Sequence, residues 1–324
     1  MDGVLHCWKI AVQDLNLTPD EGLCLSVLHT AARHGLPDLA TDVLRVLKLI
    51  AVPWEEHHFA PLIEAFCRAD QVKEALLTLN IMRTSEVEPM TETVYPLFDI
   101  VKRDTDSIDT VWAIIDKLYQ EGKQIDVSVL NVLIQASVAL GDLQRAVGAY
   151  KSFSDYQSTP NLTTFNALLK GCVEAGHREL GSLLLADMKE AKIKPDQETY
   201  QRFISLCLTQ DNYEDAFFYL EEMKAAGHVP SLSVYVSIIT KCLSAGDTRY
   251  TIAVEEMRDA GYRIPSNLMR EINDAARRRE KLGNDSLPDA GQTEGLDGAA
   301  QRFIETGGLA GMEELGKAPS TYAQ

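Results

Sequence analysis

Apolar residues return along this chain in the same short pattern about every 35 residues. Taking the first residue of each pattern as its opener, five intervals between openers are 35 residues and one is 36. Apolar residues follow each opener three, four and seven positions later, with a small Ala31 or Ser137 at the last position in two units. This spacing is one face of an amphipathic helix. The openers are Cys24, Phe59, Val94, Leu130, Phe165, Tyr200 and Tyr235.

A second apolar face follows about fifteen residues after each opener, so each unit is predicted to be a helical hairpin. Examples are Ala40, Val43, Leu44 and Leu47, then Gly181, Leu184, Leu185 and Met188, then Ala216, Tyr219, Leu220 and Met223. Glycines 35, 141, 176 and 246 stand between the two helices, where a helix end often needs a left-handed residue. Asp70, Thr105 and Asp211 replace them in three units, so we expect those turns to close differently.

Small residues and prolines complete the unit. Ala40, Ala75, Ala146, Gly181 and Ala216 recur early in the second helix, and we expect them to let the two helices of a hairpin approach closely. Proline ends the outgoing helix in "EPM", "TPN", "KPD" and "VPS", and the residue after it can cap the incoming helix. Those capping residues include Asn161, Asp196 and Ser231.

Both ends of the array are irregular, which suggests a division into four segments. We expect residues 1–18 to be a partial repeat with a second helix only, 19–265 the repeat array, and 266–283 a lone capping helix. Residues 284–324 are rich in glycine and acid and are predicted to be a disordered tail. Met257 comes one residue early, so we expect a shortened second helix or linker in the last full unit.

Composition and charge narrow the class of protein. The chain is 45% hydrophobic and 24% charged, typical of a folded protein, and has no run long enough to span a membrane. Its formal charge of −17 is unusual for a protein that binds a polyanion. The six cysteines form no CxxC pair; Cys172, Cys207 and Cys242 lie one repeat apart, which indicates a small buried residue in each repeat.

Catalytic and metal-binding patterns are not found in the sequence. It has no HExxH, no glycine-rich phosphate loop and no GxSxG. His57 and His58 are adjacent, so we expect them to point to different sides of a helix and not to bind a metal together. We therefore expect a protein that is not an enzyme and has no metal or cofactor.

The period, the "TTFNALLKGC" opening and the "EMKAAGHVPS" close resemble the pentatricopeptide repeat family. The tetratricopeptide pattern fits worse, because its period is 34 and its signature residues are absent. From the residues alone, stacked hairpins form a solenoid of either hand. With the resemblance, the expected fold is an all-α, right-handed α-solenoid of about seven 35-residue hairpins. The family's members are mostly organelle proteins that bind single-stranded RNA at one base per repeat.

The resemblance implies that two positions choose each base: the residue after the opener and the residue at the junction before the next repeat. On this chain, the recognisable pairs are Asn131 with Asn161 and Asn166 with Asp196, both similar to pyrimidine-selecting pairs. Asn161 and Asp196 also stand where helix caps belong, so capping alone is the alternative interpretation. Asn131 and Asn166 are expected on a partly exposed helix face, where solvated polar residues are common.

An arginine recurs at one position near the end of the first helix in three successive units. These are Arg33, Arg68 and Arg103. In the family this position often contacts RNA phosphate, and stacked arginines would form a charged stripe. The alternative is that arginine suits the negative end of a helix dipole.

The resulting hypothesis is a non-catalytic, monomeric organelle adaptor that recognises short pyrimidine-containing RNA and acts in mitochondrial RNA processing, stability or translation. The alternative is a protein-binding α-solenoid that uses its concave surface as a scaffold for assembly of a mitochondrial complex. Mitochondrial localisation follows from the resemblance. The N-terminus shows no transit peptide, and we expect that this sequence begins late, downstream of a lost helix and a targeting segment.

Overall fold

The chain folds as an array of helices in a computed structural model that describes residues 2–284. A first compact unit extends to Leu268 and a second begins at Met269. Within residues 2–284 there are sixteen α-helices, one π-helical segment and no strand, which confirms the all-α prediction. No helix among these residues is long and apolar enough to cross a membrane.

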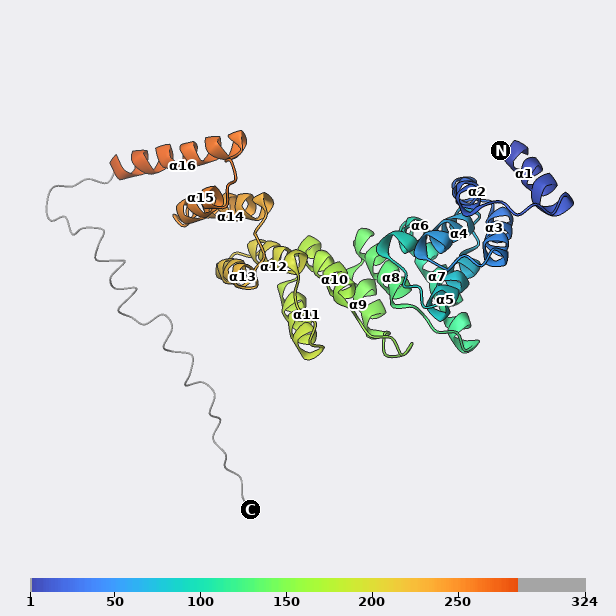
Figure 1. Cartoon of the computed structure of the whole chain (residues 1–324). Helices are drawn as coiled ribbons and strands as arrows, with labels where there is room; N and C mark the ends of the chain where they lie inside the picture. Colours follow the sequence, from blue (N-terminus) through green and yellow to red (C-terminus); the bar gives the residue numbers. More distant parts are fainter. Residues whose placement is uncertain (1, 285–324) are drawn as a thin grey trace, which may run out of the picture. The chain divides into compact units, whose positions relative to one another are not determined.

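Seven helical hairpins follow one another along the array, as the sequence pattern predicts (Figure 1). Their first helices are α2 (Glu21–His34), α4 (Glu56–Arg68), α6 (Thr91–Val101), α8 (Val127–Ala139), α10 (Leu162–Ala175), α12 (Gln197–Leu208) and α14 (Leu232–Ala245). Their second helices are α3 (Pro37–Leu49), α5 (Val72–Thr84), α7 (Thr105–Gln120), α9 (Leu143–Lys151), α11 (Arg178–Glu190), α13 (Glu214–Ala225) and α15 (Tyr250–Asp259). Before the hairpins lie α1 (Asp2–Trp8) and π-helical η1 (Lys9–Asp14), and α16 (Ser266–Asn284) follows them.

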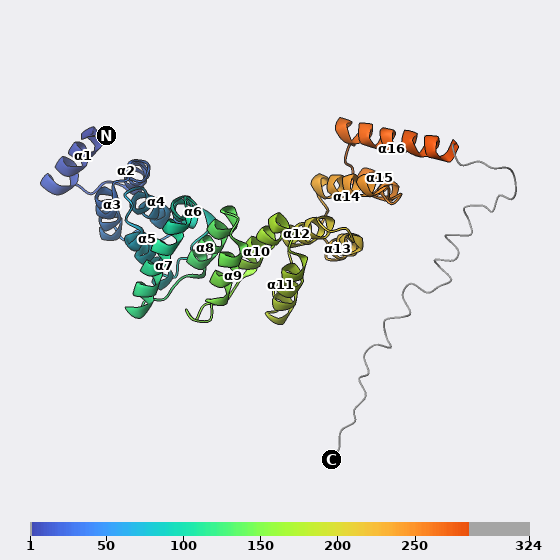
Figure 2. The same ribbon diagram turned by 180° about the vertical axis from the view of Figure 1, so that it is seen from behind.

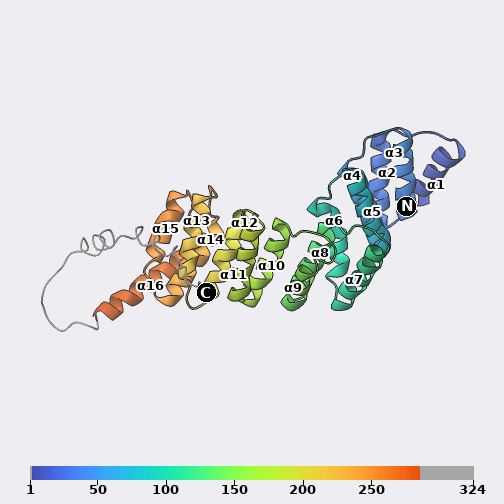
Figure 3. The ribbon, with the colours of Figure 1, turned by 90° about the horizontal axis from the view of Figure 1, so that it is seen from below.

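Each first helix packs against the first helix of the next unit and against its own second helix. In Figures 1 and 2, the helices α5, α7, α9 and α11 lie on the same side of the row formed by α4, α6, α8 and α10. Figure 3 shows the hairpins side by side in sequence order. Six of the seven openers are buried and Tyr200 is half-buried, and they lie on first helices that pack against the first helices of neighbouring units. The apolar period therefore records contacts between units.

The turns inside the hairpins close in two ways. Gly35, Gly141, Gly176 and Gly246 have positive φ, as expected for glycine after a helix. Asp70 has a φ of 59°, so the prediction that its turn closes differently was wrong: aspartate tolerates the left-handed conformation that glycine supplies elsewhere. Thr105 is the first residue of α7, capped by Asp104, so this turn does close differently.

The small residues early in the second helices are buried, and at Gly181 a close approach to the next unit is added to the contact predicted within the hairpin. Ala40, Ala75, Ala146 and Ala216 have no exposed surface. A Cβ added to Gly181 would lie 2.2 Å from Leu206 Cδ2 of α12, the first helix of the next unit. Gly181 thus serves the packing between units.

Arginines at the start of second helices connect neighbouring units. Arg178 pairs with Asp215 at 2.5 Å, Arg249 contacts both carboxylate oxygens of Glu214 at 2.6 and 2.8 Å, and Arg145 pairs with Asp109. Exposed pairs of this kind contribute little individually, about 0–1 kcal/mol. Each pair joins the second helix of one unit to the second helix of the unit beside it.

The remaining expectations concern the cysteines and the ends of the array. Cys172, Cys207 and Cys242 are buried, unpaired thiols, as predicted. The second helix of the last hairpin, α15, has 10 residues against 12 in α13, in agreement with the early Met257. The sequence predicted a helix at 266–283, and α16 covers this segment. The predicted disordered tail lies outside the described residues apart from Asn284.

Candidate nucleic-acid interface

The predicted pair Asn131 and Asn161 lies in direct contact. Asn131, on α8, donates from Nδ2 to Asn161 Oδ1 at 3.1 Å and accepts from the Thr164 hydroxyl at 2.6 Å. Asn161 is at the same time the N-cap of α10, because its Oδ1 accepts from the Thr164 backbone N–H at 3.1 Å. A helix cap and a first-helix side chain of the preceding unit therefore form one hydrogen-bonded group.

The pair Asn166 and Asp196 repeats this arrangement one unit later. Asn166 Nδ2 donates to Asp196 Oδ1 at 3.3 Å, and its Oδ1 accepts from the Thr199 hydroxyl at 2.8 Å. Asp196 caps α12 by accepting from the Thr199 backbone N–H at 2.8 Å. Burial raises the pKa of Asp196, but the hydrogen bonds from Thr199 and Asn166 outweigh it and lower that pKa overall.

These contacts correct the expected exposure of Asn131 and Asn166. They leave both interpretations of Asn161 and Asp196, helix capping and base contact, compatible with each other. Asn131 and Asn166 were expected to be partly exposed, but only 4% and 6% of their surface is accessible. They are buried because each lies between two packed first helices and finds hydrogen-bond partners there. Capping by Asn161 and Asp196 is real, and it does not exclude contact with a ligand, since the capping oxygens and the amides of the preceding unit lie side by side.

Sequence reasoning missed the threonine that links each pair. Thr164 and Thr199 directly precede openers and are fully buried, so a threonine before the opener was the available signal. Gln201 and Ser231 stand at the corresponding two positions one unit later; they depart from the pyrimidine-selecting pattern but are also in contact. Gln201 Nε2 donates to Ser231 Oγ at 3.2 Å in the next unit. Ser231 stands at the N-cap position of α14 but makes no side-chain capping bond, contrary to expectation.

The unit before these three differs, because its junction residue is held by another element. Asp126 caps α8 through the Ser128 N–H at 2.8 Å, and its side chain is 5% exposed. Arg83 of α5 forms an ion pair with it, and this hydrogen bond raises the pKa of the arginine. Asp126 is therefore engaged from the second-helix side, and Tyr95 at the opener-plus-one position remains 56% exposed.

Two adjoining cavities lie beside the pair Asn166 and Asp196, and we call them the central groove. The first, of about 370 Å³, is lined by Asn166 and Asp196 together with side chains of α6, α8, α10 and α12. The second, of about 330 Å³, reaches Gln201 and α14. Both are lined by Lys170, Glu198 and Arg202. Arg202 pairs with Glu198, while its buried Nε atom has no hydrogen-bond partner. The groove thus offers amide, carboxylate and cationic groups at one place.

The three predicted arginines lie apart from this groove, beside the turns of the first units. Arg33 and Arg68 are exposed residues in the last turns of α2 and α4. Arg68 contacts the turn of the preceding hairpin, since a Cβ on Gly35 would lie 3.1 Å from Arg68 Cβ. Arg103 lines a cavity with Asp70, the turn residue of the hairpin before it. The structure therefore places the arginines at a repeating position but does not bring them to the two polar pairs.

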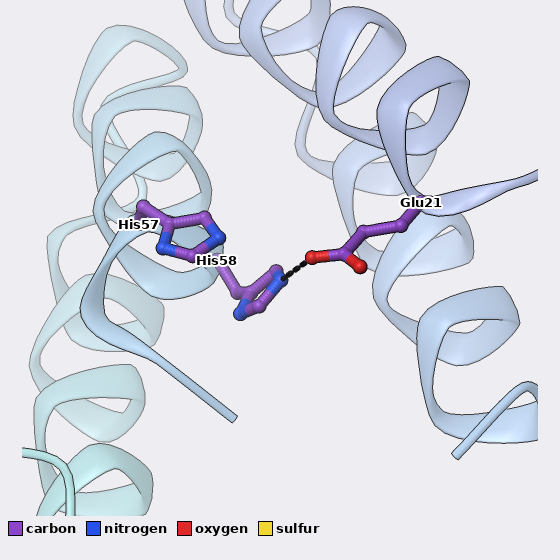
Figure 4. A group of neighbouring side chains, drawn as sticks. All are labelled: Glu21, His57 and His58. Carbon is purple, nitrogen blue, oxygen red and sulfur yellow. Dashed lines mark ion pairs between the residues drawn. The ribbon is translucent and has the colours of Figure 1, made fainter. Parts of the chain in front are cut away.

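His57 and His58 converge with Glu21, which the sequence argument did not foresee (Figure 4). The prediction that the adjacent histidines point to different sides was wrong: their ring centroids are 4.1 Å apart, and ligand atoms of all three residues lie within 4.8 Å. They sit in the first turn of α4, where the N-cap Glu55 donates its backbone N–H to His58 Nδ1 at 3.1 Å.

That bond decides what His58 can do chemically. Because Nδ1 accepts a hydrogen bond from the Glu55 backbone N–H, the neutral ring carries its hydrogen on Nε2, which faces Glu21 Oε1 at 3.8 Å. Metal ligation by Nε2 needs a lone pair there, and a ligating histidine normally donates its other ring N–H. The cluster therefore fits a histidine–carboxylate contact better than a metal site. The buried Nε2 has no hydrogen-bond partner.

Comparison with known proteins places matches along most of the array. A family model described as a pentatricopeptide repeat-containing protein matches residues 21–153, one described as the PPR repeat family matches 160–207, and one described as a PPR repeat matches 198–228. No curated protein sequence matches the chain.

Three solved structures to which the chain is similar are distant from it in sequence. The pentatricopeptide repeat protein PPR10 from maize is 18% identical with a TM-score of 0.44, over 94% of this chain and 51% of that one. PPR10 in complex with an 18-nt psaJ RNA element is 13% identical with a TM-score of 0.44, over 82% of this chain and 42% of that one. The PPR domain of Arabidopsis thaliana protein-only RNase P 1, in complex with tRNA, is 15% identical with a TM-score of 0.48, over 57% and 97%. The chain thus spans less than half of the length of the RNA-bound PPR10 chain.

Proposed function

The chain belongs to the pentatricopeptide repeat family, and from this premise we propose that it is a non-catalytic adaptor that binds a short, pyrimidine-containing single-stranded RNA. Members of the family are typically organellar, and we propose mitochondria as the site of action, with RNA processing, stability or translation as the step served. The proposal takes the protein to be a monomer.

One observation carries the proposal. The two pairs that the family resemblance marks for base choice are formed side by side, Asn131 with Asn161 and Asn166 with Asp196, in consecutive units. An amide presents both donors and an acceptor, which is what the Watson–Crick edge of a pyrimidine requires. The cations Lys170 and Arg202 line the groove beside the second pair and can meet phosphate. Arg33, Arg68 and Arg103 extend the proposed phosphate contacts to the first units.

The test is a binding titration of the full chain with U-rich and purine-rich single strands at low and moderate salt. We expect U-rich RNA to bind more tightly, and the N166A variant to weaken that binding roughly tenfold, as expected for loss of a hydrogen bond to a charged or buried partner. Val236→Ala is the matched control, because Val236 occupies the same position two units later and lines neither cavity of the groove. It should change affinity less than about twofold.

The variants are chosen to keep the fold. Asp196→Asn removes a charge but keeps a good N-cap, whereas Asp196→Ala would also cost about 1 kcal/mol of helix stability. Asp196→Asn should alter the preference among bases while the midpoint of thermal unfolding stays close to that of the wild type. Absence of binding to any RNA at low salt would contradict the proposal. Equal affinity of wild type and the Asn166→Ala variant would contradict the base-choice part alone.

A protein-binding scaffold is the second candidate, supported by a different surface. Leu183, Phe218 and Ile252 occupy successive positions on the second helices α11, α13 and α15, and they are 62%, 58% and 55% exposed. Exposed apolar rows mark protein contacts more often than nucleic-acid contacts. The charge of −17 agrees with this alternative. Co-purification of one stoichiometric protein after nuclease treatment, together with no RNA binding, would favour it.

A further inference from the structure

Helix α6 carries an exposed aromatic and cationic stripe that the polar pairs do not explain. Tyr95, Phe98 and Lys102 stand at positions i, i+3 and i+7, which places them on one face of the helix. The buried positions of α6 are taken by Val94, Leu97 and Val101. Tyr95 is 56% exposed and stands outside the core, whereas Phe98, at the apolar position four residues after the opener, is half-buried and packs with one side against the core.

The three side chains are in contact with one another. The ring centroids of Tyr95 and Phe98 are 5.9 Å apart with an interplanar angle of 44°. Lys102 Nζ lies 4.9 Å from the Phe98 centroid and 5.8 Å from the Tyr95 centroid, within the range of cation–π attraction. Lys102 is also paired with Asp99 at 2.5 Å. Because the ammonium lies nearer Phe98, the larger part of the Tyr95 ring stays accessible.

The stripe adjoins the central groove. Tyr95 occupies on α6 the position that Asn131 occupies on α8 and Asn166 on α10, and these first helices pack against each other in order. Phe98 lines the cavity of about 370 Å³ that also contains Asn166 and Asp196. A strand that follows the first helices from Asn166 on α10 past Asn131 on α8 would therefore meet this stripe on α6 with the next nucleotide.

The unit of Tyr95 has no polar pair of the kind that follows it. Its junction residue Asp126 is buried and held by Arg83, so it is not available to form a pair with the opener-plus-one residue. An exposed tyrosine replaces the amide. Aromatic side chains bind bases by stacking, and this works for any base because every base has a π-face.

We propose that Tyr95, Phe98 and Lys102 form a stacking site for one nucleobase, with Lys102 contributing a positive charge to the adjacent phosphate. This site rests on the proposed RNA-binding function and extends it to the unit beside the two polar pairs. The bound RNA then has two positions with a defined base preference and one flanking position that accepts any base. At this third position, any base should support binding, but removal of the base should weaken it.

The experiment uses the full chain and U-rich RNA in which 2-aminopurine replaces one nucleotide at a time. Stacking quenches the fluorescence of this base, so we expect one position flanking the preferred pyrimidines to be quenched on binding. The Y95A variant should lose this quenching and bind about tenfold more weakly, within the range expected for a base–aromatic stack. Tyr95→Phe keeps the ring and should behave as the wild type.

Two further measurements separate stacking from charge and from damage to the fold. An abasic nucleotide at the quenched position should weaken wild-type binding, and Tyr95→Ala should then have no additional effect. Lys102→Gln should lower the salt dependence of binding by about one phosphate contact, and Tyr95→Ala should leave it unchanged. Tyr95 is mostly exposed, so thermal unfolding of its variants should match the wild type.

The outcomes distinguish this site from the function on which it rests. RNA binding that is weakened by Asn166→Ala and unaffected by Tyr95→Ala would overturn the stacking site and leave the proposed function intact. Failure of the wild-type protein to bind any RNA would overturn both. Equal losses in Tyr95→Ala and Tyr95→Phe would assign the effect to the hydroxyl group and also overturn the stacking site.

Discussion

His58 is an ionisable side chain held without charge inside the interface between α2 and α4. It is fully buried, accepts a backbone N–H at Nδ1 and is faced by Glu21, Glu55 and His57. Burial lowers its pKa, and His57 lowers it further, while the two glutamates only partly oppose this. An unfolded chain takes up a proton on this histidine at a higher pH than the folded protein does. Acid therefore favours the unfolded state through this one residue.

The sign of the effect gives a pH prediction. The contribution of His58 to stability is complete above its unfolded pKa of about 6.5 and is lost as the pH falls below it toward the lowered folded value. We expect the free energy of unfolding in urea to fall between about pH 7.5 and 5.5 less steeply for His58→Gln, which keeps a capping acceptor but does not titrate. His57→Gln is the control, because the His57 side chain is 42% exposed. The free energy of unfolding of this variant should fall with pH almost as steeply as that of the wild type. Parallel curves for wild type and His58→Gln would contradict the prediction.

Single residues also show what a sequence can and cannot predict at the candidate site. The resemblance named Asn166 and Asp196 as partners, and the structure has them in contact. It did not predict that Asn166 is buried, because the hydroxyl of Thr199 that makes burial affordable comes from the next helix. Polar partners 30 residues apart leave no periodic signal along the chain, whereas apolar openers do.

At the scale of helices, the sequence predicted the positions of the helices well, but it predicted less well which helices pack against one another. Periodic burial is local, so hairpins could be recognised despite Pro61 inside α4 and Pro96 inside α6. The partner of a small residue is not local. Gly181 was assigned to the contact within its own hairpin, but its closest neighbour is Leu206 of the following unit. The spacing of apolar residues indicates which face of a helix is buried. It does not indicate which helix packs against that face.

This contact predicts opposite effects for two glycine-to-alanine changes. Gly148 in α9 has no atom within 4 Å of an added Cβ, so Gly148→Ala should stabilise the protein by up to about 1 kcal/mol through helix propensity. Gly181→Ala gains the same propensity but pushes on Leu206, and we expect a net loss of roughly 1–3 kcal/mol. Urea unfolding measures both. In a double-mutant cycle, Gly181→Ala combined with Leu206→Ala should cost less than the sum of the single changes. A stabilising Gly181→Ala would contradict the close approach.

At the scale of the repeat array, stability and function are distributed differently along the chain. Every unit buries the same face against the next, which is why the fold could be predicted from a period alone. The functional groups are not repeated: arginines accompany the first three units, the aromatic stripe the third, and polar pairs the units after it. No single unit combines all three. Ligand contact is therefore expected to depend on several neighbouring units being folded together.

The buried cysteines make local unfolding measurable in individual units of the array. Cys172, Cys207 and Cys242 repeat at one position in three consecutive units, and burial raises the pKa of each thiol to about 11. With equal intrinsic acidity, they should react with an alkylating reagent only when their own unit opens. The three thiols are thus reporters of local unfolding, spaced one repeat apart along the chain.

Their order of reaction measures how far cooperativity reaches. Among residues 2–284, Cys242 belongs to the last hairpin, which packs against another hairpin on one side, so we expect mass spectrometry to find it alkylated before Cys207 and Cys207 before Cys172. Exposed Cys7 should react at once and serve as the internal reference. Identical rates at the three buried thiols would instead mean that the array opens as a single block. In either case, the reaction rates of these packing cysteines report, without any added label, over how many hairpins unfolding is cooperative.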